Sequence, residues 1–218
     1  MVHFPIKQLP YAPKFTSAFL LMCLLALSAC ATAAKILYPV NEDPLSAKEG
    51  AYQLDPLHAN VIFSVSHFGF SFHHGRFNKI EGSLELDPTN PADSRVYIKL
   101  FADSIDTNSS ELDQMLKAKS MFNSAEHPYV VFESERITLL TEKSATIDGM
   151  LTMAGTKQAF SLNATFIGSG TNPLSGLQTI GFSGKGSMKR SEYHMNEWLP
   201  FVGDKVSFTI EAEFFRSK

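Results

Sequence analysis

Cysteine is scarce in this chain of 218 residues. It has two cysteines, Cys23 and Cys30, and none from residue 31 onward. The later part therefore offers no disulfide, no catalytic thiol and no thiolate metal site. Such a region depends on its hydrophobic core for stability, and 44% of all residues are hydrophobic.

Basic residues are also too few for several kinds of partner. The chain has 19 Lys and Arg against 22 Asp and Glu, a net charge of -3, and no basic cluster. Binding to nucleic acid is excluded because phosphate neutralisation needs gathered cations. Charge alone would not hold the chain on an anionic lipid surface either.

Catalytic motifs are missing as well. The sequence contains no Gly-x-Ser-x-Gly elbow and no carboxylate pair in an apolar setting. Residues 181–186 (GFSGKG) are glycine-rich, but no helix follows and their alternation is typical of a strand. We therefore expect neither enzymatic activity nor a cofactor.

Four histidines lie close together in the sequence: His58, His67, His73 and His74. Imidazole is the commonest metal ligand, so a metal-dependent enzyme is one hypothesis. However, the spacing matches no known ligand pattern and no acidic residue accompanies it at a fixed register. Ordinary strand or loop histidines explain the group better.

The N-terminus has the features of a signal peptide. Residues 18–27 are apolar but too short for a typical membrane span, and Lys7 and Lys14 precede them. We expect a signal peptide over residues 1–29 and export to the periplasm.

Two cleavage sites fit this signal peptide. Residues 27–30 (LSAC) resemble the bacterial lipobox, in which Cys30 would be lipidated and anchor the protein to the outer membrane. Residues 31–33 (ATA) instead fit ordinary cleavage near residue 33, which would release a free protein. The only membrane contact expected is the lipid anchor of the first alternative.

Residues 30–50 contain the turn formers Pro39, Asn41, Pro44, Ser46 and Gly50, a mix that is typical of a tether. From residue 51 to 218 the pattern has mostly period 2. Apolar side chains alternate with polar ones over residues 61–67, 80–86 and 206–214, as in antiparallel strands with one buried face. About eight such strands predict an all-β sandwich or barrel.

One segment departs from this alternation. Ser110 is positioned to cap a short helix, with Asp113 at the reciprocal position. Leu112, Met115 and Leu116 would then share one face. The helix either lies across the mouth of a barrel or packs on its outside.

Several ordered motifs resemble the YceI-like family. The matching segments are 52–58 (YQLDPLH), 61–69 (VIFSVSHFG), 75–77 (GRF), 82–84 (GSL), 104–107 (SIDT), 113–116 (DQML), 121–123 (MFN), 127–128 (HP), 132–134 (FES), 149–156 (GMLTMAGT) and 190–193 (RSEY). They cover about residues 51–214. The resemblance implies an antiparallel lipocalin-like β-barrel of about eight strands with one or two short helices, which in some members holds a polyisoprenoid.

The late motif departs from the family at one position. Family members usually have glycine where this chain has His194. The loss of a residue that tolerates positive φ predicts a different shape for the loop at residues 193–200, which contains Trp198. Nearby, Arg190 could clamp a carboxylate such as Glu192 or the polar head group of a ligand.

We therefore expect an apolar lipid, either a polyisoprenoid or an isoprenoid quinone, to be stored or transported in the barrel lumen. Burying each methylene gains about 0.8 kcal/mol, and the 18 phenylalanines supply an apolar lining. The alternative is a lipid-anchored envelope interaction or stress protein whose barrel is filled and binds no ligand. Whether two barrels pair as a homodimer stays open. The predicted lining consists of Phe63, Val65, His67, Phe68, Phe72, Ile98, Leu100, Leu116, Phe122, Phe132, Phe160 and Leu162.

Overall fold

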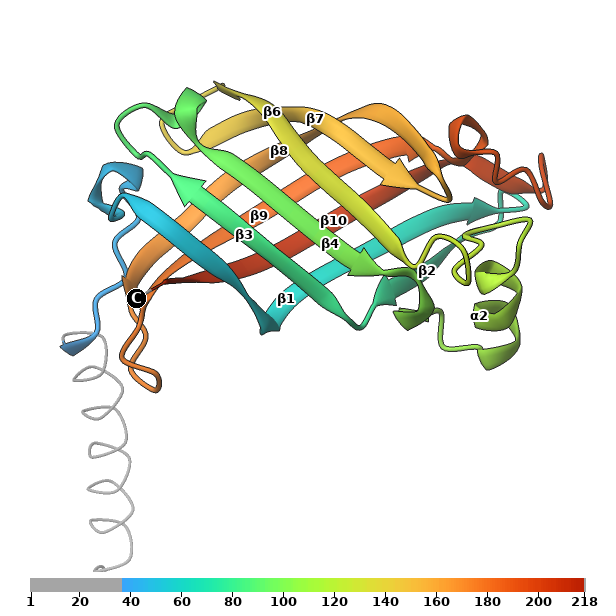
Figure 1. Ribbon diagram of the computed structural model, residues 1–218, viewed down its shortest axis with the longest axis horizontal. Helices are drawn as coiled ribbons and strands as arrows, with labels where there is room; N and C mark the ends of the chain where they lie inside the picture. Colours follow the sequence, from blue (N-terminus) through green and yellow to red (C-terminus); the bar gives the residue numbers. More distant parts are fainter. Residues whose placement is uncertain (1–36, 218) are drawn as a thin grey trace, which may run out of the picture. The chain divides into compact units, whose positions relative to one another are not determined.

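The computed structural model describes residues 37–217. The chain divides into two units, Met1–Pro39 and Val40–Lys218, and the second contains the folded domain (Figure 1). The predicted signal peptide, Cys30 and both cleavage sites lie outside the described residues. Within residues 37–217, no helix has the length and apolar character needed to cross a bilayer.

The folded unit is a closed antiparallel barrel. Pairing between its first and last strands closes the sheet, so the structure is a barrel and not a sandwich. Its eight strands agree with the number predicted from the sequence. The barrel strands are β1 (Gly50–His67), β3 (Ile80–Leu86), β4 (Arg95–Phe101), β6 (Tyr129–Leu139), β7 (Ser144–Met153), β8 (Thr156–Thr171), β9 (Gln178–Lys189) and β10 (Val202–Arg216).

Two further strands, β2 (Ser71–Phe77) and β5 (Ile105–Asp106), continue the sheet beyond β1, and Figure 1 shows β2 at one end of the barrel. The first part of β1 pairs with β3, whereas its second part pairs with β2, which in turn pairs with β5. Between these parts the register of β1 against β10 shifts, from Leu54 opposite Phe214 to Ala59 opposite Ala212. This bulge turns the strand and places extra residues on its outer surface.

One end of the lumen is filled by aromatic side chains. The ring of Phe182 lies 5.8 Å from that of Phe166 and 6.2 Å from that of Phe214, in edge-to-face arrangements. Ile180 and Tyr52 are buried in the same core. This end of the barrel is closed, as expected when side chains fill an eight-stranded barrel.

The predicted short helix is present as α2 (Ser110–Lys117), but its cap differs from the prediction. Ser109, not Ser110, is the N-cap and accepts a hydrogen bond from the Leu112 amide. Asp113 instead accepts hydrogen bonds from the amide and hydroxyl of Thr107, at 2.8 and 2.7 Å. The helix therefore begins one residue earlier than a Ser110 cap would allow, and Asp113 fastens it to the preceding loop.

Short 3-10 helices complete the fold: η1 (Pro44–Ser46), η2 (Pro91–Asp93), η3 (Ala102–Ser104) and η4 (Arg190–Tyr193). The first belongs to the segment expected to be a tether. There, Asn41 forms a bridge with Ser169 of β8, and Lys143 pairs with Glu42 at 2.8 Å. Residues 41–47 thus contact the barrel directly.

Candidate functional site

The open half of the barrel contains a large apolar cavity. Its volume is about 620 Å³, within the usual range of small-molecule sites. Side chains from β1, β4, β6, β8 and β10 line its walls, and most of them are Phe, Leu, Ile, Val or Met. The aromatic core of Phe166, Phe182 and Phe214 does not border this space. The lumen is therefore filled at one end and hollow at the other.

The structure brings together all the predicted lining residues except Phe72. The cavity is lined by Phe63, Val65, His67, Phe68, Ile98, Leu100, Leu116, Phe122, Phe132, Phe160 and Leu162. Their contact with a ligand remains a prediction. The alternating apolar positions correctly indicated which face of each strand points inward.

Phe72 does not line the cavity, contrary to the prediction. It lies on β2, where the neighbouring residue His73 faces the lumen, so the pleat directs Phe72 to the outer surface. Its side chain is 67% exposed. The short apolar pattern of residues 71–77 did not reveal the extent of β2, so the face to which Phe72 points was predicted wrongly.

Helix α2 covers one end of the cavity. Leu112, Met115 and Leu116 all line the cavity, as do Met121 and Phe122 just after the helix. This arrangement agrees with a helix across the barrel mouth and not with one packed on the outside. Figure 1 shows α2 beside the end of the barrel where β2 lies.

Sequence reasoning missed the contribution of the loop before β10. Trp198 and Phe201 both line the cavity and are also exposed. Phe68, from the β1–β2 turn, stacks on Phe201 with 5.4 Å between ring centroids, and its amide donates to the Phe201 carbonyl at 2.7 Å. These residues border the opening, and no local sequence signal connects segments so far apart.

Arg190 holds this loop in place. Its buried guanidinium donates hydrogen bonds to the carbonyl oxygens of Met195, Val202 and Gly203, at 2.6, 2.9 and 2.9 Å. Burial lowers the pKa of Arg190, and the charge of Asp204 acts in the opposite direction. The expected clamp on Glu192 was wrong, since the acceptors found are backbone carbonyls.

His194 keeps the backbone conformation that the family's glycine would provide. Its φ is 63°, and its amide closes the 3-10 turn of η4 onto Ser191. Histidine in this left-handed region is uncommon but tolerated. The loss of glycine therefore does not remove the positive φ at this position. Beside it, burial raises the pKa of Tyr193 to about 12.

The four histidines noted in the sequence do not form one site. His67 and His73 line the cavity, His74 is exposed, and His58 lies on the β1 bulge. The Nε2 atom of His73 is buried without a hydrogen-bond partner among the described residues. The structure thus gives no support to a metal centre built from this group.

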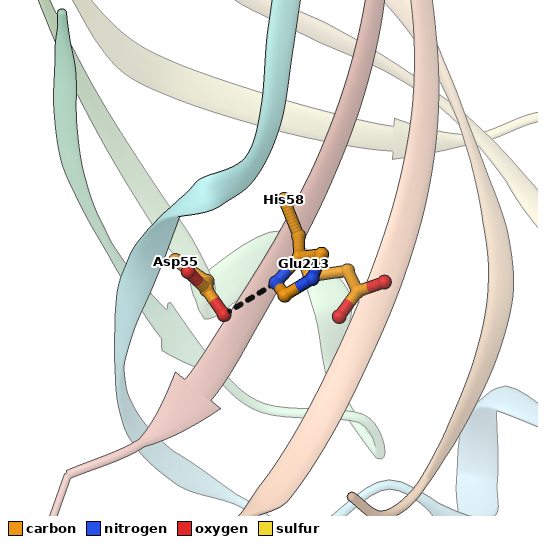
Figure 2. A group of neighbouring side chains, drawn as sticks. All are labelled: Asp55, His58 and Glu213. Carbon is orange, nitrogen blue, oxygen red and sulfur yellow. Dashed lines mark hydrogen bonds and ion pairs between the residues drawn. The ribbon is translucent and has the colours of Figure 1, made fainter. Parts of the chain in front are cut away.

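His58 instead belongs to a group that sequence spacing did not reveal. It lies between Asp55 of the same bulge and Glu213 of β10, and its Nδ1 is 2.8 Å from Asp55 Oδ2 (Figure 2). That hydrogen bond, then the charges of Asp55 and Glu213, raise the pKa of His58. The three ligand atoms lie within 4.8 Å of one another, so these residues could meet at a cation on the outer surface.

Comparison with known proteins identifies relatives over most of the chain. A UPF0312 protein of Ectopseudomonas mendocina is 31% identical over 159 residues, which are 73% of this chain and 83% of that protein. Burkholderia cenocepacia BcnA has the same fold, with a TM-score of 0.67 and 20% identity over 73% of this chain and 98% of that one.

A second solved structure with this fold is described as a polyisoprenoid binding domain from Saccharophagus degradans. It has a TM-score of 0.58 and 13% identity, and the match covers 76% of this chain and 98% of that one. The family model for the YceI-like domain matches residues 52–214. The barrel fold, the sequence relatives and the family model all agree with the motifs seen in the sequence. The chain therefore belongs to the YceI-like family.

Proposed function

We propose that this chain binds a long apolar lipid, a polyisoprenoid or an isoprenoid quinone, in the cavity of its barrel, and stores or transports it. The observation that carries the proposal is the hollow half of the lumen, about 620 Å³ and lined by apolar side chains. Filling an apolar cavity of this kind with a hydrocarbon is favourable, because it removes apolar surface from water.

Two further observations support this ligand class. The Saccharophagus degradans domain with the same fold is described as polyisoprenoid binding. Polar groups are few along the cavity wall, and the Arg190 guanidinium already donates hydrogen bonds to three backbone carbonyls. The site therefore favours a hydrocarbon chain over a charged or strongly polar ligand, and we propose a binding protein rather than an enzyme.

Native mass spectrometry of the protein from a bacterial host tests the proposal. We expect a co-purifying apolar ligand, or uptake of an added isoprenoid quinone that quenches the emission of Trp198, the single tryptophan, at the cavity opening. If the protein neither retains an apolar ligand nor takes up the added quinone, the proposal is refuted.

Two variants distinguish quinone binding in the lumen from binding on the outer wall of the barrel. Val65→Phe places a ring inside the cavity, whereas Ile62→Phe places the same ring at an exposed position of the same strand. Quinone uptake should fall in the first variant and persist in the second. Equal uptake by both would show that the quinone binds elsewhere.

For the N-terminal region we propose export to the periplasm, with either a lipid at Cys30 or a free form cut near residue 33. The support is the sequence pattern of residues 1–33. The mass of the mature N-terminus discriminates these forms, because acylation of Cys30 adds a large mass. An intact Met1 on protein recovered from cells would contradict both.

A further inference from the structure

Five exposed aromatic side chains gather at the open end of the barrel. Phe68, Phe70 and Phe72 come from the β1–β2 hairpin, and Trp198 and Phe201 come from the loop before β10. Their exposed fractions range from 39% to 90%. We call these five residues the aromatic rim. Large exposed apolar side chains in one place mark an interaction site more often than chance.

The rim is continuous with the cavity. Phe68, Trp198 and Phe201 are exposed to solvent and also line the cavity, so the cavity reaches the surface between them. By contrast, Phe70 and Phe72 do not border the cavity and are 90% and 67% exposed. Their rings are therefore available to a partner outside the barrel and are not needed to enclose a ligand.

The two segments that carry the aromatic rim are held in a defined conformation. Phe68 and Trp198 have φ values of 51° and 63°, a region that costs about 1–2 kcal/mol for a residue with a side chain. The Phe68–Phe201 hydrogen bond and stacking hold one side, and the Arg190 guanidinium holds the carbonyls of Val202 and Gly203 on the other. Strain maintained by such contacts often serves function.

From these observations we infer that the aromatic rim inserts into the surface of a lipid bilayer and docks the cavity mouth there. The inference rests on the proposed function, because the insoluble ligand of such a cavity resides in membranes. It is a membrane contact separate from the N-terminal lipid anchor, which is one of the two alternatives that the sequence left open. Tryptophan is enriched at membrane–water interfaces, and phenylalanine occurs with it on the apolar faces that peripheral segments bury at the headgroup boundary.

Charge and area favour a bilayer over a protein partner. Within residues 66–74 and 195–203, Glu197 is the only residue with a formal charge at neutral pH, leaving histidines aside. The exposed parts of the five rings amount to roughly 600 Å² if each ring offers about 200 Å². A stable dimer usually needs about 800 Å² from each partner, so a second copy of this chain fits less well.

The location of Trp198 provides a direct test. Vesicles of phosphatidylcholine, with and without phosphatidylglycerol, and with brominated acyl chains, are mixed with the protein carrying Cys30→Ser. We expect the Trp198 emission to shift to the blue and to be quenched by bromine. Quenching should be similar with and without the anionic lipid, since the rim lacks basic residues.

Variants outside the cavity test the rim itself. Phe70→Glu and Phe72→Glu should each weaken vesicle binding by at least about tenfold, the loss expected when one buried ring becomes charged. Leu174→Glu is the matched control, because Leu174 is 97% exposed in the β8–β9 loop at the opposite end of the barrel. All variants share the same N-terminal region, so differences between them report the rim.

The outcomes distinguish the possibilities. Trp198 that stays unquenched, or equal binding by the Phe70 and Leu174 variants, would overturn the inference. A dimer in solution that dissociates in Phe70→Glu without any vesicle binding would also overturn it, in favour of pairing between copies. If vesicles bind but no quinone is taken up by wild type, the rim inference stands and the lipid-carrier proposal fails. Phe70→Ser is a milder change at the same position. If it also weakens vesicle binding, the loss seen in Phe70→Glu is not caused by unfolding.

Discussion

Gly75 of β2 and Phe63 of β1 are direct partners across the strand pair, and a Cβ at Gly75 would lie 2.3 Å from Cζ of the Phe63 ring. The ring occupies the space that any other residue would need. Because Phe63 also lines the cavity, the absence of a side chain at position 75 helps to set the position of the cavity wall.

We expect Gly75→Ala to destabilise the protein by about 1–3 kcal/mol, the usual cost of overpacking a core. Denaturant unfolding measures the free energy of unfolding. The control is Gly181→Ala on β9, where the nearest atom to a new Cβ would be 3.8 Å away. Equal losses in the two variants would contradict the role of the Phe63 ring.

Arg190→Lys should cost about 2–4 kcal/mol of stability, because a lysine keeps the charge but cannot reach all three carbonyls that the guanidinium binds. The loop before β10 should loosen, which would shift the Trp198 emission to the red. Lys189→Met, at the exposed neighbouring position, should change neither quantity. A stable Arg190→Lys variant with unchanged emission would argue against this role.

The pKa of His58 should lie above its ordinary value because of Asp55 and Glu213. Because the pKa of His58 is higher in the folded than in the unfolded protein, the protonated ring stabilises the fold. This stabilisation is fully present below pH 6.5, about the pKa of an unfolded histidine, and it is lost as the pH rises through the folded-state pKa. Nuclear magnetic resonance titration of the ring measures the shift directly. In Asp55→Asn the pKa of His58 should fall, because the carboxylate that accepts its hydrogen bond is removed. An unchanged pKa would show that Asp55 and His58 do not form an ion pair.

Cavity depth should depend on two small residues. Ala59 and Ala212 are partners on β1 and β10, and both line the cavity beside its closed end. Ala212→Phe should shorten the cavity, so that a long-chain isoprenoid quinone loses about tenfold in affinity, the equivalent of about two buried methylenes. A short-chain quinone should bind as before.

Ala159→Phe, at an exposed position of β8, is the control for that substitution. It should leave the affinities for both quinones unchanged. If Ala212→Phe weakened the long and short quinones equally, the two alanines would not mark the end of the site.

Much of the barrel follows from local sequence pattern. The alternation of Val61, Phe63 and Val65 predicted which side chains face the lumen, because a strand turns successive residues to opposite faces. The spacing of Leu112, Met115 and Leu116 likewise predicted the inner face of α2. These features depend on residues close together in the chain, so the sequence alone was sufficient.

The remaining features depend on contacts between distant segments. Phe68 meets Phe201, and Asp55 and His58 meet Glu213, only after β1 and β10 have paired. The bulge in β1 determines which outer residues come together, and Pro56 is a local sign of a break in the strand but does not show which residues then meet. Phe72 was misplaced for a similar reason, since the pairing of β2 with β1 decides its face.

The edge-to-face stack of Phe166, Phe182 and Phe214 seals one end of the lumen. Within residues 37–217, the cavity therefore reaches the surface at the end that carries the aromatic rim. A lipid bound there as proposed would have to enter and leave at that same end. Release of one lipid molecule would then have to precede uptake of the next.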